Sequence, residues 1–290
     1  MGNVEAFDRM SGDARGPAAG DMNEGYVVPS REDGGTISPA GTGSLDVMRR
    51  IWGSPDAIML IFAGSAAEFA VNKAVDWLFW TNALPNDPIP RFFETVRFAQ
   101  ALIFGDQATY AAAIDAVNRA HRGVERSRGS RIPQWAYRDV LFMLIDYGER
   151  AYTIVYGPLS EPELREQFEV ALMIGRELHI EGLPSTLAEY RQARRSHLQN
   201  NTERSELTDR LYASYREHLG AWRMRALLDL QASLVPDEVA QHLGLKRKRR
   251  VDLLLRVYRF LPRRRMLRRL YPVLLPRQFG RQLAALERPT

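Results

Sequence analysis

Residues 87–124 read DPIPRFFETVRFAQALIFGDQATYAAAIDAVNRAHRGV, and this stretch decides the fold class. Asp87-Pro88 is a typical helix start, and Gly105-Asp106 ends that helix and caps the next one. Apolar residues recur between these signals at helical spacing. We therefore predict one helix up to Gly105 and a second from Asp106 to about Val124.

The same kind of pattern continues through most of the chain from Ser44 onward. Further helix starts are Ser54-Pro55-Asp56, Pro133, Ser160 to Glu163 and Thr186 to Glu189, and helical patterns also cover 205–219, 221–233 and 236–243. The helix that begins after Ser54 is expected to extend through Trp77. No stretch alternates with a two-residue period, as strands do. We predict an all-α fold, a single helical domain of about eight to ten helices.

Composition divides the chain into three parts. Residues 1–43 contain nine glycines and three prolines with almost no apolar periodicity, which predicts a disordered head. Residues 44–245 form the predicted helical domain. Residues 246–290 hold 15 Lys/Arg against 2 Asp/Glu, whereas the other 245 residues hold 25 against 33. The net charge of +5 therefore combines an acidic body with a basic tail.

The chain contains no cysteine. Disulfides, thiolate nucleophiles, zinc–thiolate sites, cysteine-held iron–sulfur clusters and thiolate-ligated haem are thereby excluded. The N-terminus lacks a signal-peptide pattern, and the longest uncharged apolar stretch, Ala57 to Ala67, is far shorter than the roughly 20 residues of a membrane span. We expect a cytoplasmic protein that is not integral to a membrane.

Several kinds of catalytic site are missing from the sequence, namely a glycine-rich phosphate loop, a nucleophile-elbow serine and a metalloprotease His-Glu pair. A helical di-iron protein would show Glu-x-x-His twice. Neither Glu177-x-His179 nor Glu238-x-x-x-His242 has that spacing.

The helical positions of the five histidines separate them. His121 follows Ile114 and Val117 on an apolar stripe, so we expect it to face the core. His179 is expected to do the same. His197 and His218 lie among charged residues and are expected either at the surface or as residues that support a site without touching its ligand. His242 stands near the end of a short helix, where a surface role is the default.

Two interpretations of His121 remain open at this point. A buried histidine is usually hydrogen-bonded and structural. A neutral imidazole that faces an apolar slot between helices is also the axial ligand that haem iron needs. Helical periodicity does not distinguish these roles.

A resemblance to a known family bears on this choice. The chain has Asp87-Pro88-x-x-Arg91-x-x-x-Thr95, then Phe104-Gly105, then His121-x-x-Val124, with Gly157-Pro158-Leu159-Ser160 and Gly182-Leu183-Pro184 further on. In order and spacing these motifs resemble the MpaB and rubber-oxygenase (latex clearing protein) family, over about residues 50–245. Members are helical haem-b proteins that use oxygen to attack lipophilic, often isoprenoid, substrates.

The resemblance implies a haem-b-dependent oxygenase in which His121 is the axial iron ligand and Arg91 and Thr95 lie near the haem. Arg91 and Thr95 are four residues apart and share one helical face. Arg91 would pair with a haem propionate, and Thr95 would hold a water or the distal oxygen. Without the resemblance, a surface salt bridge for Arg91 and a hydroxyl bonded back to its own helix for Thr95 would be preferred. Phe62, Phe92, Phe93 and Phe98 are either lining residues of an apolar substrate cavity or ordinary core.

The chain also departs from the family pattern. Many members have Ala-His-Pro where this chain has Ala63-Gly64-Ser65, and Glu68 and Asn72 follow on one helical face. Glu68 is a candidate catalytic proton acceptor. The alternative is that Glu68 and Asn72 bind within their helix or to a neighbouring one. The rival to the enzyme as a whole is a non-catalytic helical scaffold or membrane-associated interaction protein, in which His121 is only a packed residue.

The basic tail permits three interpretations. A basic amphipathic helix in 246–290 would make peripheral contact with an anionic membrane, which suits a lipophilic substrate. It would alternatively dock on the acidic body. Binding of nucleic acid ranks below both, because no recognised nucleic-acid-binding motif accompanies the charge.

Overall fold

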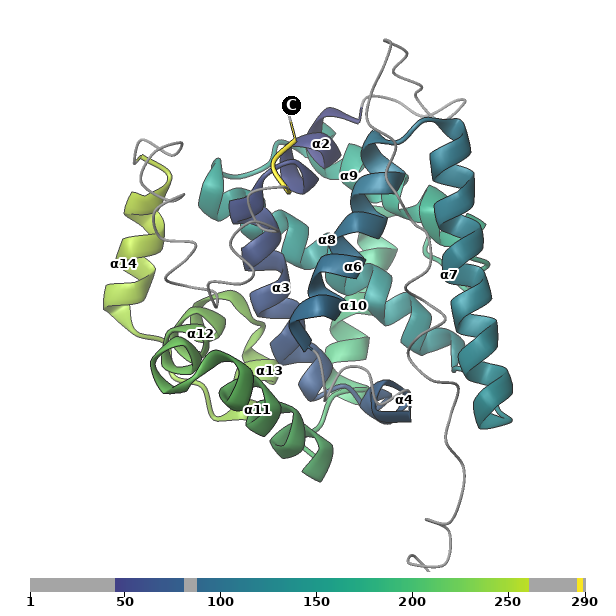
Figure 1. The fold of residues 1–290 in the computed structure, drawn as a ribbon. Coiled ribbons are helices and arrows are strands. Elements are labelled where there is room, and N and C mark those ends of the chain that lie inside the picture. Colours follow the sequence, from purple (N-terminus) through teal and green to yellow (C-terminus); the bar gives the residue numbers. More distant parts are fainter. Residues whose placement is uncertain (1–44, 81–87, 261–285, 289–290) are drawn as a thin grey trace, which may run out of the picture.

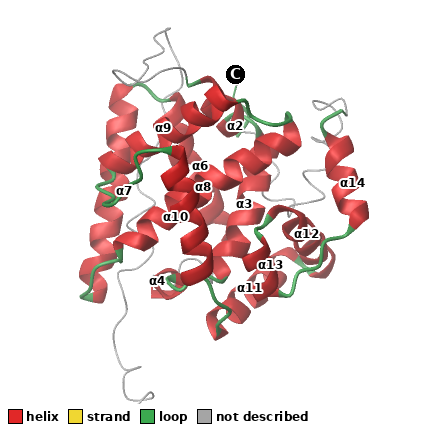
Figure 2. Cartoon of the chain, turned by 180° about the vertical axis from the view of Figure 1, so that it is seen from behind, coloured by secondary structure: helices red, strands yellow, loops and turns green. Residues whose placement is uncertain are grey.

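The computed structural model describes residues 45–80, 88–260 and 286–288, and within these ranges every regular element is an α-helix (Figures 1 and 2). The twelve helices are α2 (Asp46–Trp52), α3 (Pro55–Ala70), α4 (Val75–Trp80), α6 (Pro88–Phe104), α7 (Gln107–Arg128), α8 (Gln134–Val155), α9 (Glu161–Glu177), α10 (Leu187–Asn200), α11 (Glu206–Leu219), α12 (Ala221–Leu234), α13 (Asp237–Leu243) and α14 (Arg249–Tyr258). The predicted all-α class is confirmed.

The predicted helix starts are largely present. The Ser54 hydroxyl accepts a hydrogen bond from Ala57 N at the start of α3, and the Asp106 carboxylate accepts one from Thr109 N at the start of α7. Ser160 and Glu163 form a reciprocal capping box at the start of α9. The side chains that satisfy the first backbone N–H groups are therefore those that the sequence indicates.

The number of helices exceeds the predicted eight to ten for identifiable reasons. The helix expected to run from Ser54 through Trp77 ends at Ala70, because the backbone of 71–74 pairs with 201–203 instead. Trp77 therefore belongs to the separate helix α4. The short helix α2 lies within the helical pattern that begins at Ser44 and α14 lies within the basic amphipathic tail, and neither was among the helices predicted one by one.

Helix α3 is the centre of the molecule. It packs along α8 and also contacts α2, α11, α12 and α13 (Figure 1). Residues such as Ala57, Ile61 and Ala67 are completely inaccessible to solvent. The uncharged stretch 57–67 is thus mostly buried by other helices, as its length predicts, and Met59, Phe62 and Ala66 form its partly exposed side. No helix within the described ranges is long and apolar enough to span a bilayer.

The three predicted parts of the chain are only partly covered by the structure. The predicted disordered head, 1–43, lies outside the described residues. Of the tail, 246–260 and 286–288 are described, and Leu286 is buried against the main core. The Gln100 amide donates hydrogen bonds to the carbonyl oxygens of Trp52 and Leu286, at 2.8 and 2.7 Å. These contacts dock residues 286–288 on the body.

Two helical glycines give a matched test of how tightly α3 packs on α8. A Cβ added at Gly64 would lie 2.3 Å from the ring of Tyr147, which is completely buried. A Cβ added at Gly123 on α7 would meet nothing within 4 Å. We predict that Gly64→Ala lowers the free energy of unfolding by about 1–3 kcal/mol, because the core is overpacked. Gly123→Ala should raise it by up to about 1 kcal/mol through helix propensity.

Urea unfolding followed by far-UV circular dichroism measures both changes. A stabilising Gly64→Ala would contradict this packing of α3 on Tyr147.

Candidate active site

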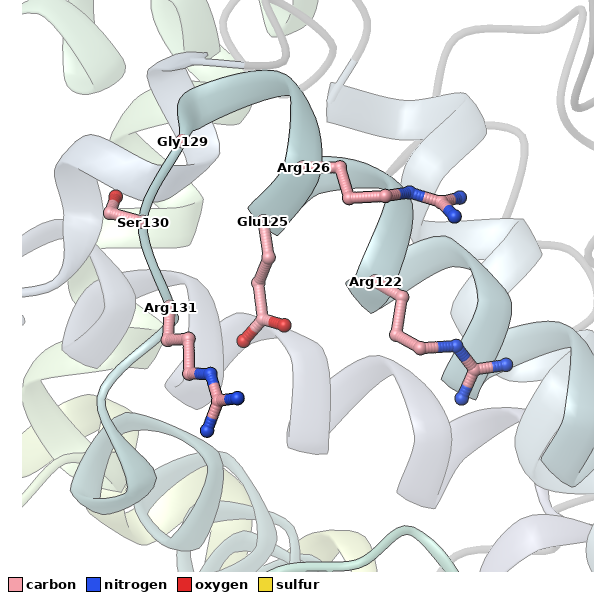
Figure 3. A pocket seen from close by; sticks show the side chains of 6 residues that line it. All are labelled: Arg122, Glu125, Arg126, Gly129, Ser130 and Arg131. Atoms are coloured by element: carbon pink, nitrogen blue, oxygen red, sulfur yellow. The ribbon is translucent and has the colours of Figure 1, made fainter.

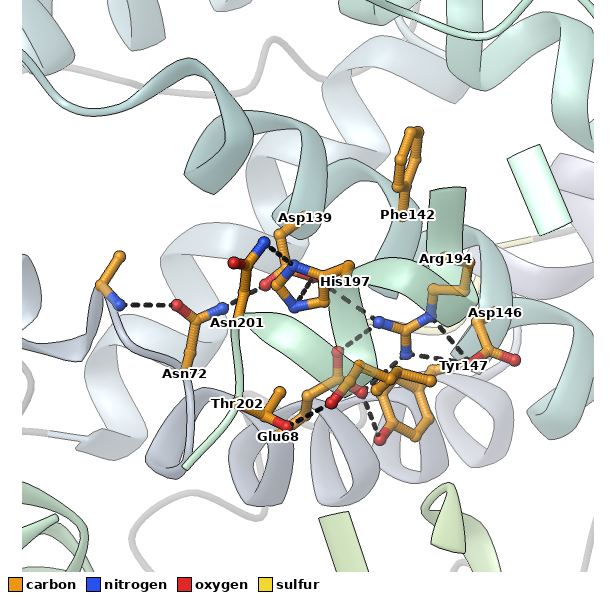
Figure 4. A network of polar contacts seen from close by, with 12 residues as sticks. Glu68, Asn72, Asp139, Phe142, Asp146, Tyr147, Arg194, His197, Asn201 and Thr202 are labelled. Carbon is orange, nitrogen blue, oxygen red and sulfur yellow. Dashed lines mark hydrogen bonds and ion pairs between the residues drawn. The ribbon is translucent and has the colours of Figure 1, made fainter. Parts of the chain in front are cut away.

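Four charged or ionisable side chains meet in the interior where α3, α8 and α10 come together (Figure 4). Glu68 from α3 is 0% exposed, Asp139 from α8 is 1% exposed, and Arg194 and His197 from α10 are 5% and 6% exposed. Burying charged groups costs free energy unless they are paired and hydrogen-bonded. Each of these groups therefore needs contacts that offset the free-energy cost of its burial.

Arg194 is the central cation of this buried cluster. Its guanidinium forms a bidentate pair with Glu68, in which Nη2 lies 2.6 Å from Oε2 and Nη1 donates to Oε1. Nη2 also donates to Asp146 Oδ2 at 2.9 Å. The Tyr147 hydroxyl donates to Glu68 Oε2 at 3.0 Å. Arg194 therefore joins two carboxylates, from α3 and α8, through the fork geometry that suits arginine.

The second carboxylate has a further partner near the surface. Arg150 Nε donates to Asp146 Oδ1 at 2.8 Å. Burial alone would raise the pKa of Asp146, but the charges of Arg194 and Arg150 outweigh it, so the pKa lies below its ordinary value. Asp146 is therefore ionised at neutral pH.

Asp139 and His197 form the other half of the cluster. Asp139 Oδ1 lies 2.5 Å from His197 Nε2, although the two atoms are not aligned as a regular hydrogen bond. Asn72 donates to the other carboxylate oxygen, and Asn201 contacts His197 Nδ1 at 3.1 Å. Burial raises the pKa of Asp139; His197 and Arg194 oppose this effect and Glu68 adds to it.

Glu68, Asp139 and His197 bring three metal-ligating atoms within 4.8 Å of one another. Carboxylate oxygen and imidazole nitrogen are ligand types that divalent metals accept, so the cluster has the donor set of a metal site. In this structure Arg194 already supplies positive charge there, with Nη1 on Glu68 and 3.6 Å from Asp139 Oδ1. A metal ion would have to compete with that guanidinium.

The expectation of a surface position for His197 was wrong, and Asp139 and Arg194 were missed. Helix α10 has few apolar residues, yet Tyr190, Arg194, His197 and Leu198 are all buried. These positions are spaced i, i+4, i+7 and i+8, so they share one helical face. That face is the only one on which α10 can bury an aromatic and a leucine together, and it includes both charged residues. The spacing of these four residues was therefore the feature of the sequence that could have predicted the burial of Arg194 and His197.

His121 lies half-buried on α7, and its ring contacts Tyr137 of α8 with 4.9 Å between ring centroids. Burial lowers the pKa of His121, and the charge of Glu125 offsets part of that effect. Among the described residues, no hydrogen bond reaches either ring nitrogen. The imidazole is therefore neutral at neutral pH and keeps its lone pair available, as a metal ligand must.

Arg91 and Thr95 lie on α6, which packs against α7. Arg91 Nη1 lies 2.6 Å from Glu94, and the exposed Thr95 hydroxyl donates to the Arg91 carbonyl at 3.0 Å. These are the local interactions that the residues favour without any cofactor. Arg91 is 14 residues before Gly105, and His121 is 16 residues after it. If α6 and α7 pack antiparallel, Arg91 and His121 lie at similar distances along the two helix axes from the turn at Gly105.

Glu68 and Asn72 both bind residues of neighbouring helices, Arg194 of α10 and Asp139 of α8 respectively. Glu68 and His121 belong to different surroundings. Tyr137 contacts His121, whereas Asp139 contacts His197, and residues two apart lie on nearly opposite faces of a helix. Helix α8 therefore stands between the buried cluster and the surroundings of His121.

His179 is not in the core, so that expectation was also wrong. Helix α9 ends at Glu177, and His179 follows with a φ of 56° and an exposed side chain. The apolar stripe of α9 stops before this residue because the helix does.

The end of α7 borders a small open pocket (Figure 3). Its volume is about 350 Å³, and its lining includes Arg122, Glu125, Arg126 and Arg131. Ligand pockets usually range from about 300 to 1,000 Å³ and are mostly apolar. A larger pocket of about 640 Å³, lined by residues of α11, α12 and α13, has both apolar and charged walls. His121 lines neither of them.

Comparison with protein families gives one match. Residues 49–283 match the family described as the ER-bound oxygenase mpaB/B'/rubber oxygenase catalytic domain. The chain belongs to this family. The match covers most of the chain and includes the motifs around Arg91, Thr95 and His121, and it extends past residue 245 into the basic tail. No curated protein and no solved structure matched the chain.

Family membership confirms the prediction of an oxidoreductase with oxygenase chemistry. Molecular oxygen and an oxidisable substrate are then its partners.

We predict that Arg194→Met destabilises the protein by about 3–5 kcal/mol, because Glu68 is left as a buried charge without its cation. Arg195→Met, one residue along on the exposed face of α10, should change the free energy of unfolding by no more than about 0.5 kcal/mol. Adding Glu68→Gln to Arg194→Met should restore part of the loss. Urea unfolding measures all three, and equal effects at 194 and 195 would contradict the buried ion pair.

Proposed function

We propose that the chain is a haem-b-dependent oxygenase that acts on a lipophilic, isoprenoid-like small molecule, with His121 as the axial iron ligand. The observation that carries this proposal is the neutral, half-buried imidazole of His121, which has no hydrogen-bond partner among the described residues of an oxygenase-family chain. Neither ring nitrogen of His121 is among the buried side-chain atoms without a partner, so both reach solvent and one is open to a ligand.

The residues assigned to the haem site suit this role to different degrees. The donor type fits, since a neutral imidazole is the commonest protein ligand of haem iron in cysteine-free sites. Arg91 carries a permanent positive charge, and exchange of Glu94 for a propionate would keep it paired. Thr95 would have to turn its hydroxyl from the Arg91 carbonyl towards a bound water. Bound haem would supply the activation of oxygen.

Aromatic side chains beside α6 would provide the apolar surroundings for the substrate. Phe62 and Phe92 meet edge to face at 4.4 Å between centroids, and Phe92 and Phe93 do so at 4.7 Å. Phe62, Phe92 and Phe98 are only partly buried against the core. In the proposed enzyme these rings exclude water and hold an alkene or similar group next to the oxidant.

A role for Glu68 as a catalytic proton acceptor stays a prediction. Its bidentate pair with Arg194 and the hydrogen bond from Tyr147 both stabilise the carboxylate. Protonation of Glu68 would therefore have to overcome both partners.

A lipophilic substrate partitions into membranes, so the proposed enzyme would work close to a membrane surface. Cytoplasmic location and peripheral membrane contact through 246–290 belong to this proposal as expectations.

The proposal predicts haem content that depends on one histidine. Protein expressed with ample haem should show a Soret band and a positive pyridine haemochrome assay, and His121→Ala should lose most of both. His179→Ala is the matched control, because His179 is exposed at the end of α9 and should leave haem content unchanged. A haem-free wild type, or equal haem in wild type and His121→Ala, would favour the non-catalytic scaffold instead.

A further inference from the structure

The outward face of α14 is unusually apolar for an exposed helix. Leu253, Leu254 and Val257 are 62%, 68% and 44% exposed, and Phe260, just after the helix, is 75% exposed. Their spacing of i, i+1, i+4 and i+7 places them on one stripe. Single exposed apolar residues are ordinary on a protein surface, but a contiguous stripe marks an interaction site.

Residues at the two ends of α14 attach the helix to the body. Lys248 and Arg250 both pair with Asp229 of α12, the latter at 3.8 Å between Nη2 and Oδ2. Tyr258 packs against the main core. Helix α14 lies at one edge of the molecule next to α12 (Figure 1). The apolar stripe is thus held in a fixed direction, away from the body.

Cations flank this stripe. Arg249 and Arg256 are exposed, seven residues apart, and project from the same edge of the stripe. Neither forms an ion pair with a residue that the structure describes. Residues 246–260 contain seven Lys/Arg and one Asp, so the surroundings of the stripe are strongly positive.

We propose that this face of α14 docks on an anionic phospholipid membrane, with Leu253, Leu254, Val257 and Phe260 in the headgroup–acyl boundary. A helix with an apolar face and flanking cations lies in the plane of such an interface. The phosphates of a nucleic acid would bind the arginines, but the leucines would stay exposed to water. A second copy of the chain would cover the leucines but bring two sets of cations together. Of these three, an anionic lipid surface satisfies both features, and the inference does not depend on haem.

The test is co-sedimentation of the full chain with vesicles of equal parts phosphatidylcholine and phosphatidylserine, against vesicles of phosphatidylcholine alone. The wild type should bind the anionic vesicles much more strongly. Leu253→Ser with Leu254→Ser should weaken binding at least about tenfold, from lost apolar burial. Arg249→Ala with Arg256→Ala should weaken it about 25-fold, since each cation near an anionic surface contributes about fivefold.

Arg119→Ala with Arg195→Ala is the matched control, because it removes the same charge from exposed positions on α7 and α10 and should leave binding unchanged. Thermal melting and haem absorbance on the same samples show whether a variant has lost its fold or its cofactor instead. Absence of binding to anionic vesicles would overturn the proposal. Binding that depends on the arginines but not on the leucines would overturn it too, as would a leucine-dependent dimer that binds no vesicles.

Discussion

The ion pair between Arg194 and Glu68 is the interaction on which the centre of this molecule depends. Both partners are essentially inaccessible to solvent, so water cannot replace either one. The guanidinium reaches α8 through Asp146, and the carboxylate reaches it through the Tyr147 hydroxyl. Three helices that are far apart in the sequence are thereby held in one register, which apolar packing alone specifies less strictly.

The close approach of α3 and α8 follows from the same constraint. Gly64 lies one helical turn before Glu68, and the absence of its side chain lets the Tyr147 ring lie against the α3 backbone. A larger residue there would push α8 away and lengthen the hydrogen bond to Glu68. The Ala63-Gly64-Ser65 segment is therefore suited to this packing.

Much of the fold could be predicted from the sequence, because helix starts and ends are local. Ser54, Asp106 and Ser160 cap the helices that their neighbours indicate, and Gly105 ends α6. The break at 71–74 could not be predicted in this way, since it depends on pairing with 201–203, far along the chain. The buried cluster was missed for a similar reason. A charged residue is normally solvated, and only its partners on other helices show that Arg194 and Asp139 belong inside.

The surroundings of His121 and the buried cluster differ in a way that bears on function. Every charge in the cluster has a partner from a second helix, so that region is suited to rigidity. His121 has no hydrogen-bond partner among the described residues, and it contacts the cluster's own helix through Tyr137. The Tyr137 hydroxyl donates to Glu125 Oε1 of α7 at 3.2 Å, which holds the tyrosine ring next to His121. A ring packed against a tyrosine keeps its orientation. In the proposed enzyme one ring nitrogen of His121 would bind iron, and the other N–H would donate to solvent, since metal-bound histidines almost always hydrogen-bond through their second nitrogen.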